Sequence, residues 1–284
     1  MNQAILITAY KDPCQLKRLI NKMQDFFIYV HVDKKAKEMY SELRNEYKEE
    51  NRVIILSKYS ISWGSYNHLR AVVCLMKLVE SNPEVKYVHV VSGQDYPVVD
   101  SETFAGFEFC KNVYMTCKRV TETNDGILGR YNKRHLLNNF LDIRSDLYGR
   151  IDKRFAKHRE RIGCFDVREL YKGMIWASMP IDVCRYVLSF IRSNEGRGFF
   201  YGLKYSEIPE EVFFQTIVMH SKYRDFVVSD NLRYTLWQEK HGSSPGILDE
   251  SDYESIQNSN AVFARKIDSS FSLNLIGLLD NHNE

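Results

Sequence analysis

The sequence predicts an α/β protein built on a mostly parallel sheet with helices on both faces. Short apolar runs of strand length alternate with longer amphipathic segments over the first 120 residues. No internal repeat and no Pro- or Gly-rich linker interrupts the 284-residue chain. Parallel strands need crossover connections of this length, and such connections are usually helices.

The alternation can be followed along the chain. We expect strands at residues 5–9, 27–32, 53–56 and 87–91, because these runs are short and rich in Ile, Val and Tyr. We expect helices at residues 13–23, 36–49 and 68–80. In the last of these, apolar residues such as Leu69, Val72, Val73 and Met76 recur at helical spacing.

The second half of the chain is expected to add a strand at residues 172–178, a helix at 180–191 and a helix beginning at Pro209. The predicted organisation is a single domain over residues 1–284. Residues 1–120 form a nucleotide-binding half. Residues 121–284 form an acceptor and catalytic half, with a basic helical insertion near residues 130–162.

Composition excludes several classes of protein. A net charge of +2 is too small to predict nucleic-acid binding. The six cysteines have no paired spacing, so we expect free buried thiols and no zinc site. No leader and no apolar stretch of membrane-spanning length is legible, so we expect a cytoplasmic protein, or a chain without its anchor.

The segment from residue 130 to residue 161 is strongly basic, with ten Lys or Arg residues against four Asp or Glu, and apolar residues lie between them. One hypothesis is peripheral contact with an anionic membrane. The alternative is a solvated charged face, which we favour because acidic residues are mixed in.

Polar residues follow two of the predicted strands. Asp33 ends the second strand, and the loop Ser92, Gly93, Gln94 and Asp95 ends the fourth. Ligands bind at the carboxyl ends of parallel strands, so a nucleotide is expected here. For Asp33 the alternative is a carboxylate that caps the next helix. Asp95 begins an Asp-Tyr-Pro turn and is not assigned as a metal ligand.

Pro209, Glu210 and Glu211 begin an apolar helix. The helix dipole favours an ionised carboxylate at this end, which suits a residue that must accept a proton. The alternative is an ordinary helix start, because Pro and Glu are common there.

Five short motifs occur in a defined order: His31 to Lys35, Ser62-Trp63-Gly64, Ser92 to Pro97, Pro209-Glu210-Glu211, and Phe263 to Lys266. Together they resemble the core-2/I-branching enzyme family, glycosyltransferases that add β-1,6-linked N-acetylglucosamine and are related to peptide xylosyltransferases. The resemblance extends to about Asp268. It implies a GT-A-like glycosyltransferase fold with a Rossmann-type sheet, a UDP-sugar donor, inversion at the anomeric carbon and no divalent metal or other cofactor.

The sequence contains no Asp-x-Asp motif, which usually holds the metal in GT-A enzymes. Arg233 and Lys266 resemble the basic pair that binds the diphosphate in this family, and two cations can replace a metal electrostatically. For each, the alternative is a surface salt bridge.

Glu211 resembles the catalytic base of the family, whereas Glu210 points about 100° around the helix and is read as a helix-start carboxylate. The resemblance implies that Glu211 takes a proton from an acceptor hydroxyl, which attacks opposite the departing diphosphate. Asp33 resembles the residue that binds uracil.

Three tryptophans were considered for sugar or nucleotide contacts. Trp63 is expected to shape the donor pocket, and Trp176 and Trp237 to stack on a sugar of the acceptor. Packing in the core is the alternative for each.

Animal members carry a Golgi anchor and disulfides, which this sequence lacks, so it resembles a prokaryotic cytoplasmic relative. Its expected acceptor is a surface polysaccharide or a lipid-linked glycan. UDP-N-acetylglucosamine is the first donor hypothesis, and UDP-xylose or UDP-glucuronate the second. The alternative from another class is an inactive nucleotide- or glycan-binding protein.

Overall fold

The computed structural model describes residues 2–123, 125–138 and 141–282. Its centre is a seven-stranded sheet with the order β14-β6-β13-β4-β1-β2-β3. Every neighbouring pair is parallel except those of β13, which runs antiparallel to β4 and β6. The predicted fold class, a mostly parallel sheet of the GT-A-like type, is confirmed.

The strands of this sheet are β1 (Gln3–Ala9), β2 (Phe27–Val32), β3 (Val53–Leu56), β4 (Tyr87–Ser92), β6 (Val113–Tyr114), β13 (Ser178–Pro180) and β14 (Val227–Val228). A second sheet has the order β15-β16-β5, formed by β15 (Arg233–Thr235), β16 (Phe263–Arg265) and β5 (Asp95–Pro97). Short pairs are β7 (Lys118–Arg119) with β12 (Tyr171–Lys172), β8 (Lys133–Arg134) with β9 (Lys157–His158), and β10 (Arg161–Ile162) with β11 (Phe165–Asp166).

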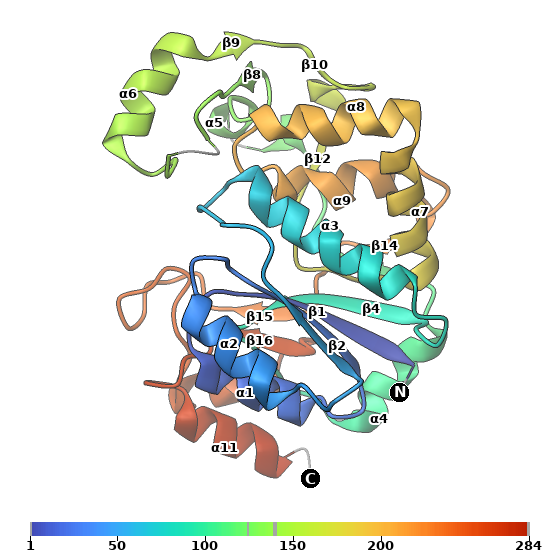
Figure 1. Ribbon diagram of the computed structural model, residues 1–284, viewed down its shortest axis with the longest axis vertical. Helices are drawn as coiled ribbons and strands as arrows, with labels where there is room; N and C mark the ends of the chain where they lie inside the picture. Colours follow the sequence, from blue (N-terminus) through green and yellow to red (C-terminus); the bar gives the residue numbers. More distant parts are fainter. Residues whose placement is uncertain (1, 124, 139–140, 283–284) are drawn as a thin grey trace.

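Helices cover both faces of the main sheet (Figure 1). On one face lie α3 (Tyr66–Glu80), α7 (Ile181–Arg192), α8 (Asn194–Gly202) and α9 (Glu210–Met219). On the other lie α1 (Pro13–Lys22), α2 (Lys37–Glu46) and α4 (Ser101–Gly106), while α11 (Leu273–His282) packs against the small sheet. The remaining helices are α5 (Asp125–Leu128), α6 (Asp146–Phe155) and α10 (Tyr253–Gln257).

Apolar packing explains this arrangement. The sheet is buried on both sides, so residues of β1 alternate between two cores: Ala4 and Leu6 face α3 and α9, and Ile5 and Ile7 face α1. A third core lies between the small sheet and α10 and α11. The small sheet thereby brings Arg265 of β16 opposite Asp95 of β5.

Two expectations differ in detail from the structure. Residues 172–178 were predicted as one strand, but strand structure is confined to β12 and β13, and residues 173–177 between them are irregular. The six cysteines, all within the described part of the chain, are free as expected; Cys184 is buried, but Cys14 is exposed.

The basic segment near residues 130–162 contains β8, α6 and β9. Residues 139 and 140 of this segment lie outside the described part of the chain. In Figure 1 these elements lie at the top of the molecule. No helix among the described residues combines the length and the apolar character needed to cross a bilayer.

Candidate active site

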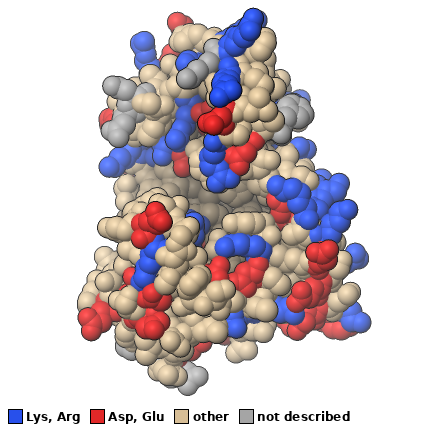
Figure 2. Space-filling model, turned by 90° about the vertical axis from the view of Figure 1, so that its left-hand side faces the viewer, with Lys and Arg blue, Asp and Glu red and all other residues tan. Residues whose placement is uncertain are grey.

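The carboxyl ends of β1, β2 and β4 lie side by side and form one edge of the main sheet. The amide of Asp33 donates to the carbonyl of Ala9 at 2.8 Å, and that of Gly93 donates to the carbonyl of Thr8 at 3.0 Å. These bonds hold the loops that follow β2 and β4 against the end of β1. A hollow with Lys and Arg side chains along its upper rim opens on the side of the molecule that Figure 2 shows.

Asp33 is buried and holds the loop that follows β3. Its Oδ1 accepts from the amide of Lys35 at 2.9 Å, and its Oδ2 accepts from the amide of Ile61 at 3.3 Å. The expected alternative, a cap on the next helix, does not occur, because the cap residue of α2 is Ala36 and makes no side-chain bond. Any contact of Asp33 with a base is therefore additional to this structural role.

His31 holds the same loop from inside the sheet. Its Nε2 accepts from the amides of Lys58 and Tyr59, at 3.2 and 3.1 Å. Burial lowers the pKa of His31 to about 4, so the ring is neutral at pH 7. Together, His31 and Asp33 fix the segment that leads to Trp63.

Trp63 is 49% exposed, and the guanidinium of Arg144 lies 5.0 Å from its ring centroid. The next residue, Gly64, has a φ of +68°, and a Cβ there would lie 2.7 Å from Cδ1 of Ile143. The carbonyl of Gly64 accepts from the amide of Ile208 at 3.0 Å. The Trp63 turn thus joins the strand ends to the basic segment and to the loop before α9.

The Ser92–Asp95 loop is held by its own carboxylate. Oδ2 of Asp95 accepts from the Ser92 amide at 2.7 Å and from the Ser92 hydroxyl, while the Gln94 amide donates to that hydroxyl oxygen at 3.2 Å. Asp95 is fully buried, with its Oδ1 3.7 Å from Nε of Arg265. Its carboxylate balances the charge of Arg265 and shapes the loop from below.

The two carboxylates at the start of α9 have different partners. Glu211 is partly exposed, with its Oε2 3.1 Å from Nζ of Lys172 and 3.6 Å from Nη1 of Arg130. Burial raises the pKa of Glu211, and the charges of Lys172 and Arg130 only partly oppose this. The helix dipole alone would favour the ionised carboxylate of Glu211, and burial opposes this. A raised pKa improves a carboxylate as a proton acceptor near neutral pH.

Glu210 has a role that the sequence did not predict. Its Oε1 lies 3.0 Å from Nδ1 of His68, and Nε2 of His68 lies 3.3 Å from the hydroxyl of Thr8, near the end of β1. Glu210 therefore does more than begin a helix, because it links α9 through α3 to the strand ends.

Arg233 and Lys266 have different surroundings in the structure. Arg233 is buried, and its guanidinium donates to the Ser178 hydroxyl at 2.9 Å, to the Val90 carbonyl at 3.0 Å and to the Asn231 carbonyl. The guanidinium turns inward because these acceptors lie in the layer between the two sheets. Arg233 is therefore not the surface salt bridge that was the alternative for this residue.

Lys266 instead lies among other cations. Its Nζ is 3.0 Å from the Ser243 hydroxyl, and burial together with the charges of Arg265 and Lys11 lowers its pKa. Lys11 follows β1 directly and pairs with Asp268 at 3.1 Å. We call Lys11, Arg265 and Lys266 the basic cluster. Carboxylates balance two of these charges, Asp268 that of Lys11 and Asp95 that of Arg265, so the cluster keeps a net positive charge at a strand-end edge, which suits a diphosphate.

The other two tryptophans lie in different surroundings. Trp176 is buried, with the Arg265 guanidinium 4.8 Å from its ring centroid and the His68 ring 6.0 Å away. Trp237 is 62% exposed in the loop that follows β15. Trp176 therefore lies beside Arg265 of the basic cluster, and the ring of Trp237 is exposed at the surface.

Sequence reasoning missed Lys11, His68 and Arg265. Lys11 could have been found because it follows the first strand, where ligands bind. Arg265 could have been found because it stands beside Lys266 in the motif Phe263 to Lys266. Nothing in the sequence indicated His68, which contacts Glu210 across 142 residues.

One group of described residues has donors at metal-ligand spacing: His135, Asp152 and Glu207. Nδ1 of His135 lies 2.7 Å from Asp152, and its Nε2 lies 3.1 Å from the carbonyl of Gly129. Both ring nitrogens of His135 therefore already have partners within the protein. The group holds α6 and β8 together.

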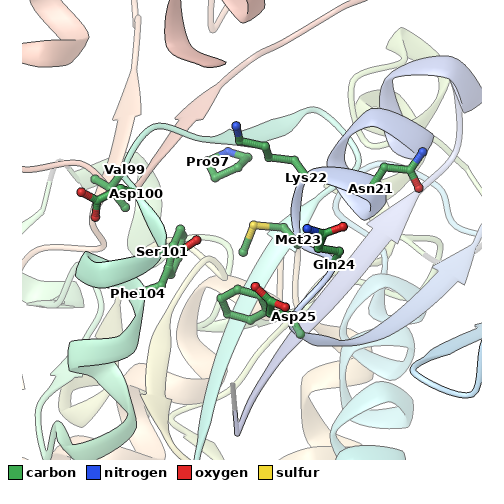
Figure 3. Close-up of a pocket in the computed structure, with 11 residues that line it drawn as sticks. Asn21, Lys22, Met23, Gln24, Asp25, Pro97, Val99, Asp100, Ser101 and Phe104 are labelled. Atoms are coloured by element: carbon green, nitrogen blue, oxygen red, sulfur yellow. The ribbon is translucent and has the colours of Figure 1, made fainter. Parts of the chain in front are cut away.

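Two cavities lie away from the strand ends. The first has about 200 Å³ and lies before the start of β2; Figure 3 shows side chains from the end of α1, such as Met23, facing the β5–α4 connection near Phe104. It lies at the amino end of β2, opposite the edge that the loops form. The second is lined by residues of β8, β10 and α8.

Comparison with known proteins places these features in context. The sequence model of the core-2/I-branching enzymes matches residues 4–258. Xylosyltransferase 2 of Rattus norvegicus is 26% identical over 94% of this chain and 32% of its own length. Xylosyltransferase 1 of Homo sapiens is 24% identical over 97% of this chain and 30% of its own length.

This chain thus spans about a third of the length of these curated relatives. Among solved structures, mouse xyloside xylosyltransferase 1 in its apo form aligns over 95% of this chain and 99% of its own, with 9% identity and a TM-score of 0.42.

Proposed function

The chain belongs to the core-2/I-branching enzyme family, and on that premise we propose that it transfers a sugar from a UDP-sugar to a glycan acceptor. The observation that carries the proposal is the basic cluster of Lys11, Arg265 and Lys266 at the strand ends. The first turn of α9, which carries Glu211, is linked to this cluster through Glu210, His68 and Trp176. An inactive binding protein has no need of a partly exposed carboxylate with a raised pKa.

The proposed step is a single displacement with inversion. Glu211 accepts the proton of an acceptor hydroxyl while the oxygen of that hydroxyl bonds to the anomeric carbon. The bond from that carbon to the diphosphate breaks, and UDP leaves with the electron pair. The basic cluster stabilises the charge that develops on the diphosphate, in place of a divalent metal.

Arg233 acts in this proposal as a positioning residue. The charge of Asp95 acts on Arg233, and the same carboxylate lies beside Arg265. Replacing the buried guanidinium would therefore disturb the basic cluster without removing a phosphate contact.

The family favours UDP-N-acetylglucosamine as donor and a β-1,6 branch as product, whereas the curated relatives named above are xylosyltransferases and favour UDP-xylose. We propose N-acetylglucosamine first. Trp63 and Asp33 would border the nucleotide, and the exposed Trp237 an acceptor such as a surface polysaccharide or glycolipid.

Release of UDP from a panel of UDP-N-acetylglucosamine, UDP-xylose and UDP-glucuronate, with EDTA present, tests the proposal. We expect turnover with one donor in EDTA, and a Glu211→Gln variant slower by about 10²–10⁴-fold in kcat. The control is Glu254→Gln, an exposed carboxylate on α10. Activity that appears only with added Mn²⁺ or Mg²⁺ would overturn the metal-free step, and full activity of Glu211→Gln would overturn the base assignment.

A further inference from the structure

A second cavity, distinct from the strand-end site, opens between α8 and the short strands β8 and β10. It has a volume of about 230 Å³ and is lined by the side chains of Arg134, Arg159, Arg161, Tyr201 and Tyr205, with glycines of α8 and of the β10–β11 turn. None of the described residues that line it is Asp or Glu. Figure 1 places these elements at the top of the molecule, at the opposite end from α11.

Arg159 supplies a buried positive charge to this cavity. Its guanidinium donates to the carbonyls of Tyr131 at 2.8 Å and Gly202 at 2.9 Å, and to the hydroxyl of Ser206 at 2.6 Å. All of these acceptors are neutral. Burial and the charge of Arg134 lower the pKa of Arg159 to about 10, so it stays charged at pH 7 but without a counter-ion.

The other two arginines increase this imbalance. Within the described ranges, no carboxylate lies within ion-pair distance of Arg134, Arg159 or Arg161. Some arginines elsewhere are paired, such as Arg144 with Asp142 and Arg192 with Glu80. Like charges around a cavity repel one another, and a bound anion would relieve that repulsion.

Aromatic rings complete the site. Tyr201 is 61% exposed on α8, and Tyr205 follows it at the rim. Gly163 has a φ of +59°, and a Cβ there would lie 2.2 Å from the amide nitrogen of Phe199, so only glycine lets β10 approach α8 this closely. A flat aromatic face beside guanidinium forks suits a sugar ring that carries a negative group.

We propose that this cavity is a binding subsite for an anionic glycan, in which the exposed Arg134 and Arg161 receive a phosphate, sulfate or carboxylate, the buried charge of Arg159 adds to their field and Tyr201 receives the sugar ring. The inference rests on the proposed function only in naming a glycan as the ligand. The subsite is connected to the candidate base, because Arg159 holds Ser206 in the connection from α8 to α9, whose first turn carries Glu211.

The test compares two double variants of equal charge change. Arg134→Gln with Arg161→Gln removes exposed charges of the cavity and leaves buried Arg159 in place. Arg150→Gln with Arg154→Gln removes two exposed charges of the same basic segment, on α6 and outside the cavity lining. Calorimetry then measures binding of a sulfated oligosaccharide, a polyuronate oligosaccharide and a neutral xylo-oligosaccharide, each without donor. Thermal unfolding shows that each variant is folded.

We expect at least one acidic oligosaccharide to bind the wild-type protein more tightly than the neutral one. The cavity variant should bind it at least about 10-fold more weakly, because charge-assisted hydrogen bonds to the acidic group are lost. The α6 variant should retain wild-type affinity. An equal loss in both variants, or no preference for acidic oligosaccharides, would overturn the subsite.

Vesicles of phosphatidylglycerol provide a second arm. Binding to these vesicles that depends on Arg134 and Arg161, with no binding of acidic oligosaccharides, would overturn the glycan and identify a lipid phosphate. Failure of the proposed function is recognised separately, because UDP release in the donor panel does not require this cavity, and binding of oligosaccharides does not require transfer.

Discussion

Single side chains decide how charge is distributed at the strand ends. Lys266 carries an ammonium among the cations Lys11 and Arg265, and its lowered pKa reflects their repulsion as well as burial. Arg233, by contrast, donates hydrogen bonds from its guanidinium to acceptors within the protein. The electrostatic work that a metal would do on the diphosphate therefore belongs, in our proposal, to the basic cluster.

A Lys266→Met variant should bind UDP about 10-fold or more weakly, because a charge-assisted contact to the diphosphate is lost. Uridine, which has no phosphate, should bind the variant and the wild type equally. Calorimetry with both ligands measures the difference. Lys48→Met, at an exposed lysine beside Glu49, is the control. Equal weakening for uridine would mean that Lys266 shapes the pocket and does not bind the diphosphate.

At the scale of elements, α9 depends on the segment that crosses its first turn. The amide of Gly173 donates to the carbonyl of Glu211 at 2.8 Å, and Gln215 donates to the carbonyl of Met174 at 2.7 Å. This irregular segment, between β12 and β13, holds Glu211 in place in the first turn of α9. Its backbone must pass close to residue 116.

We expect Gly173→Ala to lower the free energy of unfolding by about 1–3 kcal/mol, because its Cβ would lie 1.7 Å from the carbonyl oxygen of Thr116. Urea unfolding measures the loss. Gly106→Ala is the matched control, since no atom lies within 4 Å of a Cβ at that position and Gly106 is helical. Equal stability of the two variants would show that the 173–174 segment moves freely.

Apolar periodicity predicts local elements of this chain better than it predicts the partners of single side chains. The strands and helices of the first half were predicted from apolar periodicity to within a few residues, as for α3, expected at 68–80 and found at Tyr66–Glu80. The predicted strand at 172–178 failed because its apolar residues pack irregularly between α9 and the sheet. The inward turn of Arg233 could not be predicted, because a sequence motif fixes neither the direction of a side chain nor its partners.

Over the whole molecule, buried neutral histidines tie the sheet to its loops. His31 accepts from the loop after β3, and His89 bonds to Ser178 and Gln3 within the core. Burial holds the pKa of His89 well below its ordinary value and that of His31 at about 4. Both must stay neutral in the folded state.

Stability should therefore fall in acid. His31 titrates near 6.5 when unfolded and near 4 when folded, so between these values the unfolded chain binds more protons. The contribution of His31 is fully present above pH 6.5 and is lost as the pH falls toward 4, by about 3 kcal/mol. Urea unfolding at several pH values measures it. We expect a shallower decrease for His31→Gln, and an unchanged one for the exposed His158→Gln. The same slope in both would contradict the assignment.

The sequence by itself determined the alternation of strands and helices, the polar residues at strand ends and the carboxylates that begin α9, because these depend on local periodicity and on the direction of parallel strands. The tertiary structure alone decided which charges meet: Lys11 with Lys266 and Arg265, Glu210 with His68, and three arginines around a second cavity. Such meetings join residues distant in sequence, and only the packing of the sheets and helices sets the direction of each side chain.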